Sequence, residues 1–500
     1  MANPLKKLSG QTVVYGLGTI LPRFLNYFLT PILTRAFVPA EYGIHSVLYS
    51  YISFLNVLFM YGMETTFFNF YSKLENKTSV FSTSFVAILS STLLFSTILM
   101  GFTPLISDYL STNNATYTYQ LIFWSIGIIA SEALLSIPFA KLRGENKALK
   151  FSLLKLFNVV VSFSLTLFFI GVCKPAYDSC DGSIFESLYK PEIGIGYAFL
   201  ANLIANVFSL LLVLPQLKQI KFPIDTGMLK DMLKYTWPLI ILGFAGMINE
   251  VLDRLILKDL MADKAQAQIA QGIYGACYKI AILMTIFIQA FRFAAEPFFF
   301  GKAKDKDAKK TYALVMKYFI IFCLVLFLGT VLNLDWIKYF IDEPYWEGLA
   351  VVPILLIANL CLGVVYNLSI WYKLSGQTKY GAVIAICGAV VTIVVNVLFV
   401  PQYSYIACAW ATLGAYGTMM VLSYLLGQKY YPVKYNVRAI SVYVGLTFLL
   451  YLISSVFNGV DSFVLRTALN NLLIVLFVWI IYKLEINNLK KLGTNVATAN

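Results

Sequence analysis

Long apolar segments follow one another along almost the whole chain, with only short polar loops between them. Each segment has about 20 residues or more, the length that an α-helix needs to cross a ~30 Å hydrocarbon core. Only 13% of the 500 residues are charged, whereas a soluble domain carries roughly 25%. The pattern therefore predicts an all-α integral membrane protein.

The segments predict 14 transmembrane helices, arranged as two sets of six and a final pair. We expect an N-terminal lobe in 1–222, a C-terminal lobe in 223–430, helices 13 and 14 in 431–485, and a disordered cytoplasmic tail in 486–500. Two lobes with even helix numbers share one orientation, so a pseudo-two-fold axis along the membrane normal would relate them. The expected helices lie near 9–37, 42–70, 81–102, 118–140, 150–171, 192–215, 232–257, 269–300, 309–332, 349–375, 380–400, 403–427, 436–456 and 463–484.

Basic residues alternate between the loops as the positive-inside rule requires. One set of alternate loops, which includes both termini, carries 25 lysines and arginines, and the other set carries 8, among them Arg254 and Lys258. This alternation predicts that both termini are cytoplasmic. The net charge of +13 does not indicate nucleic-acid binding, because the basic residues occur in short clusters between apolar segments.

Five basic residues fall inside the predicted helices, where an ionised side chain costs several kcal/mol unless it faces protein or water. Lys155 and Lys317 lie close to cytoplasmic helix ends, so we expect them to reach the interface by snorkelling. Arg23 lies on the order of 20 Å deep, beyond easy snorkelling. Segment 269–300 contains the other two, Lys279 and Arg292.

Intramembrane carboxylates are candidates for ion coupling or for balancing these cations. For Glu250, an i,i+4 ion pair with Arg254 is at least as plausible as ion coupling, and Arg292 could pair with Glu296 in the same way. The single histidine, His45, excludes a histidine metal site or proton relay, and we expect no cofactor. The candidate carboxylates are Glu64, Glu132, Glu250, Asp253 and Glu296.

Two of the seven cysteines, Cys173 and Cys180, share a predicted periplasmic loop. An oxidising compartment permits a disulfide there, and the spacing alone does not decide whether one forms.

Several segments resemble those of a known family. They are YGLGTILPRFLNYFLTPILTR (15–35), PAEYG (39–43), YGMETTFFNFYSK (61–73), NEVLDR (249–254), YGACYK (274–279), QAFRFAAEPFFF (289–300) and the hairpin 375–412. Over about residues 9–430 the chain resembles the Wzx-like polysaccharide flippases of the multidrug/oligosaccharidyl-lipid/polysaccharide exporter superfamily.

The resemblance implies a multi-pass protein of the bacterial inner membrane that flips an isoprenoid-diphosphate-linked oligosaccharide to the periplasmic leaflet. It implies two six-helix lobes around a cavity, with the last two helices outside the lobes helping to guide the lipid tail. Its expected partners are that glycolipid, membrane lipids and other polysaccharide-assembly proteins. A dianionic diphosphate needs fixed cations, so Arg23, Lys279 and Arg292 are the candidate headgroup ligands.

Two alternatives remain open. A cation-coupled exporter of small molecules, from the same superfamily, would favour a compact aromatic and acidic cavity. A membrane polymerase or ligase of the same pathway would be expected to place catalytic groups in a large periplasmic loop, but the longest such loop, 172–191, has no histidine. No Walker-type phosphate-binding motif is present, so the chain does not hydrolyse ATP.

Overall fold

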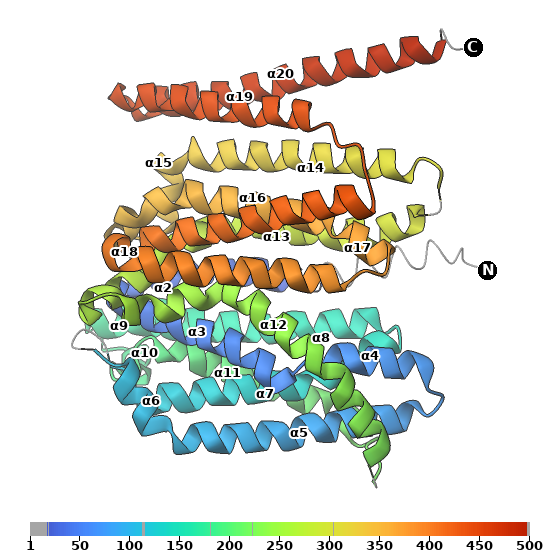
Figure 1. Ribbon diagram of the computed structural model, residues 1–500. Helices are drawn as coiled ribbons and strands as arrows, with labels where there is room; N and C mark the ends of the chain where they lie inside the picture. The colour runs from blue at the N-terminus through green and yellow to red at the C-terminus, as the bar shows by residue number, and fades with distance from the viewer. Residues whose placement is uncertain are drawn as a thin grey trace.

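The computed structural model describes residues 18, 20–112, 116–180, 182–222, 224–303 and 305–497, and long helices dominate it (Figure 1). The main helices are α2 (Leu29–Ala36), α3 (Pro39–Met60), α4 (Met63–Lys73), α5 (Lys77–Gly101), α6 (Thr103–Leu110), α7 (Tyr119–Gly144), α8 (Ala148–Thr166), α9 (Lys174–Ser179), α10 (Ile184–Leu188), α11 (Gly196–Leu217), α12 (Thr226–Leu260), α13 (Lys264–Lys302), α14 (Ala308–Val331), α15 (Leu334–Ile337), α16 (Val351–Leu368), α17 (Ile370–Leu374), α18 (Lys379–Tyr430), α19 (Val437–Val456) and α20 (Phe463–Ala497). A π-helical segment, Leu167–Cys173, follows α8, and 3₁₀ segments cover Lys338–Phe340, Glu343–Ala350 and Phe457–Gly459.

Eleven helical stretches within the described residues are long and apolar enough to cross a membrane, so the chain is a multi-pass membrane protein. One of them, α18, is 52 residues long and contains two of the predicted helices, joined at a kink where Ser404 has φ 50°. The charged α12 is not among the eleven, and the first predicted helix lies partly outside the described residues. The all-α membrane fold is confirmed, and the number 14 stays a prediction.

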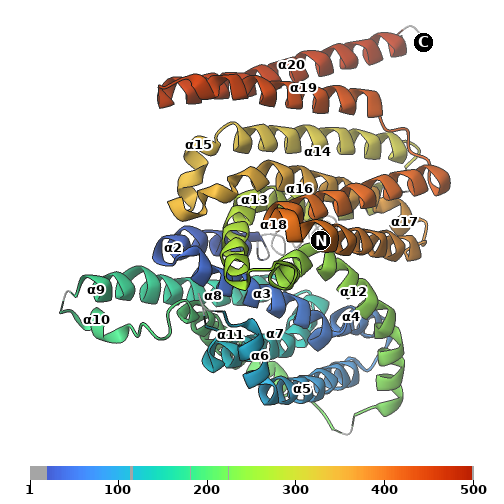
Figure 2. The same ribbon diagram turned by 60° about the vertical axis from the view of Figure 1, so that its left-hand side comes forward.

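The helices form two groups with a final pair outside them (Figures 1 and 2). The blue to cyan helices α3–α8 and the green α11 make the first group, and α13, α14, α16 and α18 make the second. The bent helix α12 runs between the groups and contains Pro238, which lacks the N–H that would continue the helical ladder. The red helices α19 and α20 lie beyond α14.

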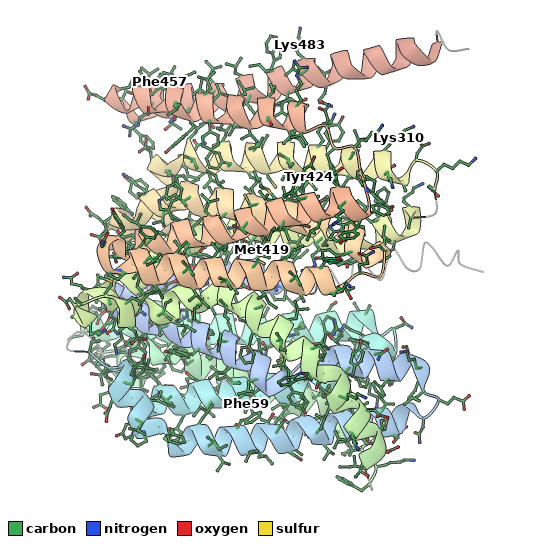
Figure 3. All side chains as sticks on the ribbon, viewed as in Figure 1. Phe59, Lys310, Met419, Tyr424, Phe457 and Lys483 are labelled. Carbon is green, nitrogen blue, oxygen red and sulfur yellow. The ribbon has the colours of Figure 1, made fainter. Side chains whose placement is uncertain are left out.

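We call the end of the molecule that carries the lysine-rich loops the basic end. Lys310, in the first turn of α14, lies at this end, and Phe457, after α19, lies at the other (Figure 3). We call the end that lies across the molecule from the basic end the opposite end. The turn that joins α12 to α13, around residues 261–263, lies at the opposite end, so both helices run between the two ends.

The two groups of helices are in contact at the opposite end. The buried Lys258 of α12 donates hydrogen bonds to the carbonyl oxygens of Tyr109, Leu110 (2.8 Å) and Ser111 (3.4 Å), which terminate α6. The Tyr345 hydroxyl donates to the carbonyl oxygen of Phe37 at 2.7 Å. We call the hydrogen bonds of Lys258 to these carbonyls the Lys258 latch.

Helices α3 and α13 meet through small residues. A Cβ atom added to Gly272 would lie 1.9 Å from the carbonyl oxygen of Pro39, and one added to Gly275 would lie 2.4 Å from Oγ of Ser46. Only residues without a side chain allow backbones to approach this closely in a membrane protein. The contact packs the first group tightly against α13 near the opposite end.

Helices α19 and α20 are fastened to α14 by a buried polar cluster, which we call the C-terminal clamp. Nζ of Lys317 pairs with the carboxylate of Glu485, and the hydroxyls of Tyr318 (3.1 Å) and Tyr443 donate to the same carboxylate. Lys317 therefore does not snorkel as predicted, because a carboxylate from a helix far along the chain lies within reach.

Helix α20 also extends further than predicted. The described helix continues to Ala497, whereas the sequence predicted a disordered tail from 486 onward. No proline interrupts the stretch after residue 484, and lysine, leucine and asparagine can all continue a helix at modest cost.

Candidate functional site

A polar cavity of about 300 Å³ lies between the two groups of helices, lined by α2, α3, α8 and α11 on one side and by α12 and α13 on the other. Its wall mixes hydroxyl, amide and charged groups with only a few aliphatic side chains. The polar and charged lining residues are Asn26, Thr30, Tyr42, His45, Ser46, Tyr49, Ser50, Ser53, Asn158, Ser162, Asn202, Glu250, Arg254, Tyr278 and Lys279.

Two cations line this cavity and form no ion pair with a carboxylate of the described residues, and we call Arg254 and Lys279 the deep cations. Lys279 forms no hydrogen bond or ion pair with any described residue. Nε and Nη2 of Arg254 are buried and lack hydrogen-bond partners within the described part of the chain. The guanidinium carbon of Arg254 lies 4.0 Å from the ring centre of Tyr278, a cation–π contact that fixes its plane.

Neither neighbouring carboxylate accepts a hydrogen bond from Nε or Nη2 of Arg254. Asp253 is buried; its Oδ2 accepts from the Tyr274 hydroxyl at 2.6 Å and its Oδ1 accepts from the backbone N–H of Arg254 at 2.8 Å. Glu250 lines the cavity, but the predicted i,i+4 ion pair with Arg254 is not among the ion pairs of the described residues. Asp253 is thus a structural hydrogen-bond acceptor, and Glu250 is the acid that shares the cavity with the deep cations.

The other two predicted headgroup ligands, Arg23 and Arg292, lie nearer the basic end, and we call them the mouth cations. The Arg23 guanidinium donates to the side chain of Gln289 on α13, one helical turn from Arg292. Arg292 lies 5.0 Å from the ring centre of Tyr366 and 3.9 Å from Glu296, whose other oxygen accepts from Lys373 at 2.6 Å. Arg292 and Glu296 thus form the expected i,i+4 pair, in competition with Lys373.

The structure therefore separates the three predicted cations into two places. Lys279 and Arg292 are 13 residues apart on α13, which corresponds to about 20 Å along a helix. Arg23 joins Arg292 at the mouth, and Lys279 joins Arg254 in the cavity. Arg254 was missed because its charge was attributed to an outer loop; α12 continues to Leu260, which leaves Arg254 more than one turn inside the helix.

The remaining predicted carboxylates belong to the first group of helices. Glu64 of α4 forms an ion pair with Arg143 at the end of α7, so it has a structural partner that its local sequence did not reveal. Oε2 of Glu132 on α7 accepts a hydrogen bond from Asn56 at 2.6 Å. Lys155 of α8 has its ammonium 4.9 Å from the ring centre of Phe139.

Cys173 and Cys180 are both free thiols, the first buried and the second exposed. Helix α9 separates them, and seven residues of mostly helical chain span about 10 Å, beyond the Cα separation that a disulfide bridges. Among the described residues, no group of three or more His, Cys, Asp and Glu side chains is placed to hold a metal ion.

Tyr109, on the short helix α6, adds a second contact next to the Lys258 latch. Its hydroxyl donates to Oδ2 of Asp259 at 2.6 Å, and burial together with that carboxylate raises the pKa of Tyr109. An ordinary tyrosine hydroxyl is already protonated at physiological pH, and the raised pKa of Tyr109 extends this donor form to more alkaline pH.

Comparison with known proteins identifies the family and the fold. The family described as "Polysaccharide biosynthesis protein" matches residues 9–301. No curated protein matches the chain by sequence.

Solved structures of several transporters are similar in fold. Lipid II flippase MurJ in an inward closed conformation aligns with a TM-score of 0.67 and 16% identity, covering 95% of this chain and 100% of that chain. An outward-facing multidrug resistance MATE family transporter of the MOP superfamily aligns with a TM-score of 0.60 and 13% identity, covering 86% of this chain and 96% of that chain. At these identities the likeness concerns the fold.

Proposed function

The chain belongs to the polysaccharide biosynthesis protein family, and from this membership we propose that it flips an isoprenoid-diphosphate-linked oligosaccharide across the bacterial inner membrane. The substrate would move from the cytoplasmic to the periplasmic leaflet by alternating access. The basic end would then be cytoplasmic, as the distribution of lysines and arginines predicts. The fold shared with a lipid II flippase supports a transporter rather than an enzyme.

The observation that carries the proposal is the set of cations along the path between the helix groups. In this proposal a polar headgroup moves past Arg23, Arg292 and Lys279, and the proposal is supported by the absence of an ion pair to Lys279 among the described residues. Unpaired cations are costly inside a membrane protein unless they serve a ligand or water. A diphosphate supplies the missing charge, and arginine binds phosphate oxygens bidentately.

The neutral part of the cavity suits a glycan. Asn26, Asn158 and Asn202 line it together with several hydroxyl side chains, and such groups can exchange hydrogen bonds with sugar hydroxyls. Without these partners, the transfer of a polar headgroup through hydrocarbon would be prohibitive.

Alternating access requires one end of the path to be closed while the other admits substrate. The described contacts between the helix groups at the opposite end include the Lys258 latch and the close packing of Gly272 on Pro39. Arg23 and Arg292, nearer the basic end, are exposed. In this conformation we propose that the glycolipid headgroup enters from the basic end.

An apolar groove of about 350 Å³ supports a route for the lipid tail. It lies between α14, α16, α18 and α19 and is lined by residues such as Leu324, Phe327 and Val444. The C-terminal clamp holds one wall of this groove in place. The tail would occupy it while the headgroup passes through the cavity.

The roles of the acidic residues are also proposals. Glu250 and Glu296 would balance the charge of the cations that they accompany. Glu132 remains the candidate for ion coupling, supported by its place inside the first group of helices with the Asn56 amide as its hydrogen-bond donor.

A test uses proteoliposomes that contain a fluorescent isoprenoid-diphosphate oligosaccharide. Wild-type protein should move the lipid between leaflets, and Arg23→Ala and Arg292→Ala should each reduce the rate at least about 10-fold, a change of ~1.4 kcal/mol. Thermal unfolding of each variant checks folding. If the wild type moves no glycolipid but transports organic cations, the alternative of a cation-coupled exporter, favoured by the acidic Glu250 among tyrosines in the cavity, replaces this proposal.

A further inference from the structure

The first part of α12, residues 226–237, is not needed to cross the membrane. The part from Pro238 to Leu260 would alone span about 34 Å as a helix, more than the ~30 Å hydrocarbon core. Helix α12 bends, and the proline at position 238 lacks the N–H that would continue the helical ladder (Figure 1). Residues 226–237 therefore form a separate element that precedes a membrane-crossing helix, and we call them the α12 arm.

The α12 arm lies at the basic end, against α5. The Ser84 hydroxyl donates to Sδ of Met232 at 3.7 Å. The Ser82 hydroxyl oxygen accepts a hydrogen bond from the backbone N–H of Lys221, just before the arm, at 2.9 Å. Both serines lie within about two turns of the start of α5. The arm is thus placed near the helix ends, where the lipid headgroups of a surrounding membrane would lie.

One face of the α12 arm packs on the protein. Met228, Met232 and Thr236, spaced at i, i+4 and i+8, are buried. The ring of Tyr235 makes an edge contact with Phe70 of α4, with the ring centres 6.4 Å apart. This spacing places the three buried side chains on one side of the helix and so fixes which side is turned away from the protein.

The side of the arm that is turned away from the protein carries Lys230, Leu233, Lys234 and Trp237, which we call the outer face. These residues are spaced at i, i+3, i+4 and i+7, so they are neighbours on the helix surface. All four are exposed, and Trp237 is 65% exposed. Neither lysine forms an ion pair with a described residue. The outer face thus combines exposed apolar side chains with unpaired positive charge.

The loop before the arm has the same character. Lys218, Lys221 and Phe222 are exposed, and Phe222 is 72% exposed. Oδ1 of Asp225 accepts from the backbone N–H of Met228 at 2.9 Å, so this carboxylate caps the arm. The loop and the arm together carry four lysines and two aspartates, one of which serves as the cap.

This composition suits the headgroup layer of a membrane. Tryptophan rings prefer the boundary between hydrocarbon and headgroups, and lysine side chains extend along apolar surface to place the ammonium group near phosphate. Each lysine close to an anionic leaflet strengthens the attraction about 5-fold, so several lysines distinguish anionic from zwitterionic phospholipids. The position of the outer face, directly before a membrane-crossing helix, favours a lipid surface over a soluble acidic partner.

We infer that the outer face, together with Lys218, Lys221 and Phe222, binds the anionic phospholipid headgroups of the leaflet at the basic end. The inference is independent of what the cavity transports. The arm continues into the part of α12 that carries Arg254 and the Lys258 latch. Bound lipid would therefore hold one end of the helix that runs between the two helix groups.

The fluorescence of Trp237 tests whether the outer face contacts lipid, and which lipid it contacts. The full-length protein is placed in nanodiscs that contain equal amounts of phosphatidylglycerol and phosphatidylcholine, with bromine on the acyl chains of one lipid or of the other. The signal of Trp237 is the difference between the wild type and Trp237→Phe. Brominated phosphatidylglycerol should quench this signal at least about 2-fold more than brominated phosphatidylcholine, because the lysines enrich the anionic lipid around the arm.

Two double variants locate the preference. Lys230→Gln/Lys234→Gln, measured against the same variant with Trp237→Phe, should lose most of it. Lys306→Gln/Lys309→Gln is the matched control, because it removes two exposed lysines near the start of α14, in the other helix group. This control should keep the preference. Thermal unfolding in the nanodiscs checks that each variant is folded.

Three results would overturn the inference. Equal quenching by the two brominated lipids in the wild type would mean that the arm has no preference for anionic headgroups. Quenching by neither lipid would mean that the outer face lies against water or a soluble partner. An equal loss of preference in the two double variants would assign it to the overall charge of the basic end rather than to the outer face.

Discussion

Lys279 and Lys317 lie on consecutive helices, α13 and α14, but only Lys317 has an ion-pair partner among the described residues. Lys317 pairs with Glu485 and shares that carboxylate with two tyrosine hydroxyls. Lys279 lines the cavity and has no hydrogen bond or ion pair with a described residue. The clamp carries its own counter-charge, whereas we propose that a ligand supplies the counter-charge in the cavity. On this proposal, a charge that holds the fold together differs from a charge that serves transport in whether the chain supplies its partner.

The largest expected effect is on thermal stability, and it concerns the C-terminal clamp. The Lys317 and Glu485 side chains are only 12% and 9% exposed, and removal of one partner of a buried ion pair costs about 3–5 kcal/mol. Lys317→Met should therefore lower the unfolding temperature strongly, as measured by differential scanning fluorimetry. The double variant Lys317→Met/Glu485→Met should recover most of the loss. A double variant as unstable as the single one would show that the ion pair is not what fastens α20 to α14.

The opposite result is expected for the cavity. Lys279→Met removes a charge that has no partner among the residues the structure describes, so stability should stay within about 1 kcal/mol of wild type. Glycolipid flipping should fall at least about 10-fold, because the cavity loses one of its two deep cations. The measurement is the proteoliposome assay with unfolding curves in parallel. Strong destabilisation of Lys279→Met would place this lysine with the clamp rather than with the transport path.

The Lys258 latch should show a smaller effect, on conformation. Lys258→Met removes charge-assisted hydrogen bonds, which contribute about 1.5–3 kcal/mol each, and should favour opening at that end. A reporter cysteine at the cavity residue Ser50 should react about 3- to 10-fold faster with a maleimide added from that side. Lys264→Met is the matched control, because within the described part of the chain Lys264 bonds to the carbonyl oxygens of Lys258 and Asp259 in the last turn of α12 and not to α6. Equal labelling of the two variants would rule out a latch at Lys258.

The smallest expected effect concerns the mouth. Lys373 bonds Glu296 at 2.6 Å and so competes with Arg292 for that carboxylate. Lys373→Met should release Glu296 to pair with Arg292, which would weaken glycolipid binding about 2- to 3-fold at low salt and less at high salt. Exposed Lys379, changed to Met, serves as the control. Tighter binding in Lys373→Met would mean that Glu296 does not restrain Arg292.

The sequence was sufficient for features that depend on local composition. The helical membrane fold follows from apolar segments of spanning length, and the unusual charges of α13 were visible because they interrupt such a segment. Features that depend on distant parts of the chain were not predicted. Glu485 lies 168 residues from Lys317 in the sequence, and Arg143 lies far from Glu64. Neither ion pair could therefore be predicted from the residues that surround its members in the sequence. Arg254 was misplaced because helix ends are the least certain part of such a prediction: its charge was counted with the outer loop, whereas α12 continues to Leu260 and carries Arg254 into the cavity wall.

The central claim is that the partnerless cations act on the anionic charge of the substrate. The most direct measurement compares flipping of a fluorescent isoprenoid-diphosphate oligosaccharide with flipping of an analogue whose phosphates are methylated to neutral esters, in proteoliposomes of the wild-type protein. Our account predicts that the neutral analogue moves at least about 10-fold more slowly, and that Arg254→Gln and Lys279→Met remove most of this difference. Equal flipping of the two lipids would contradict it.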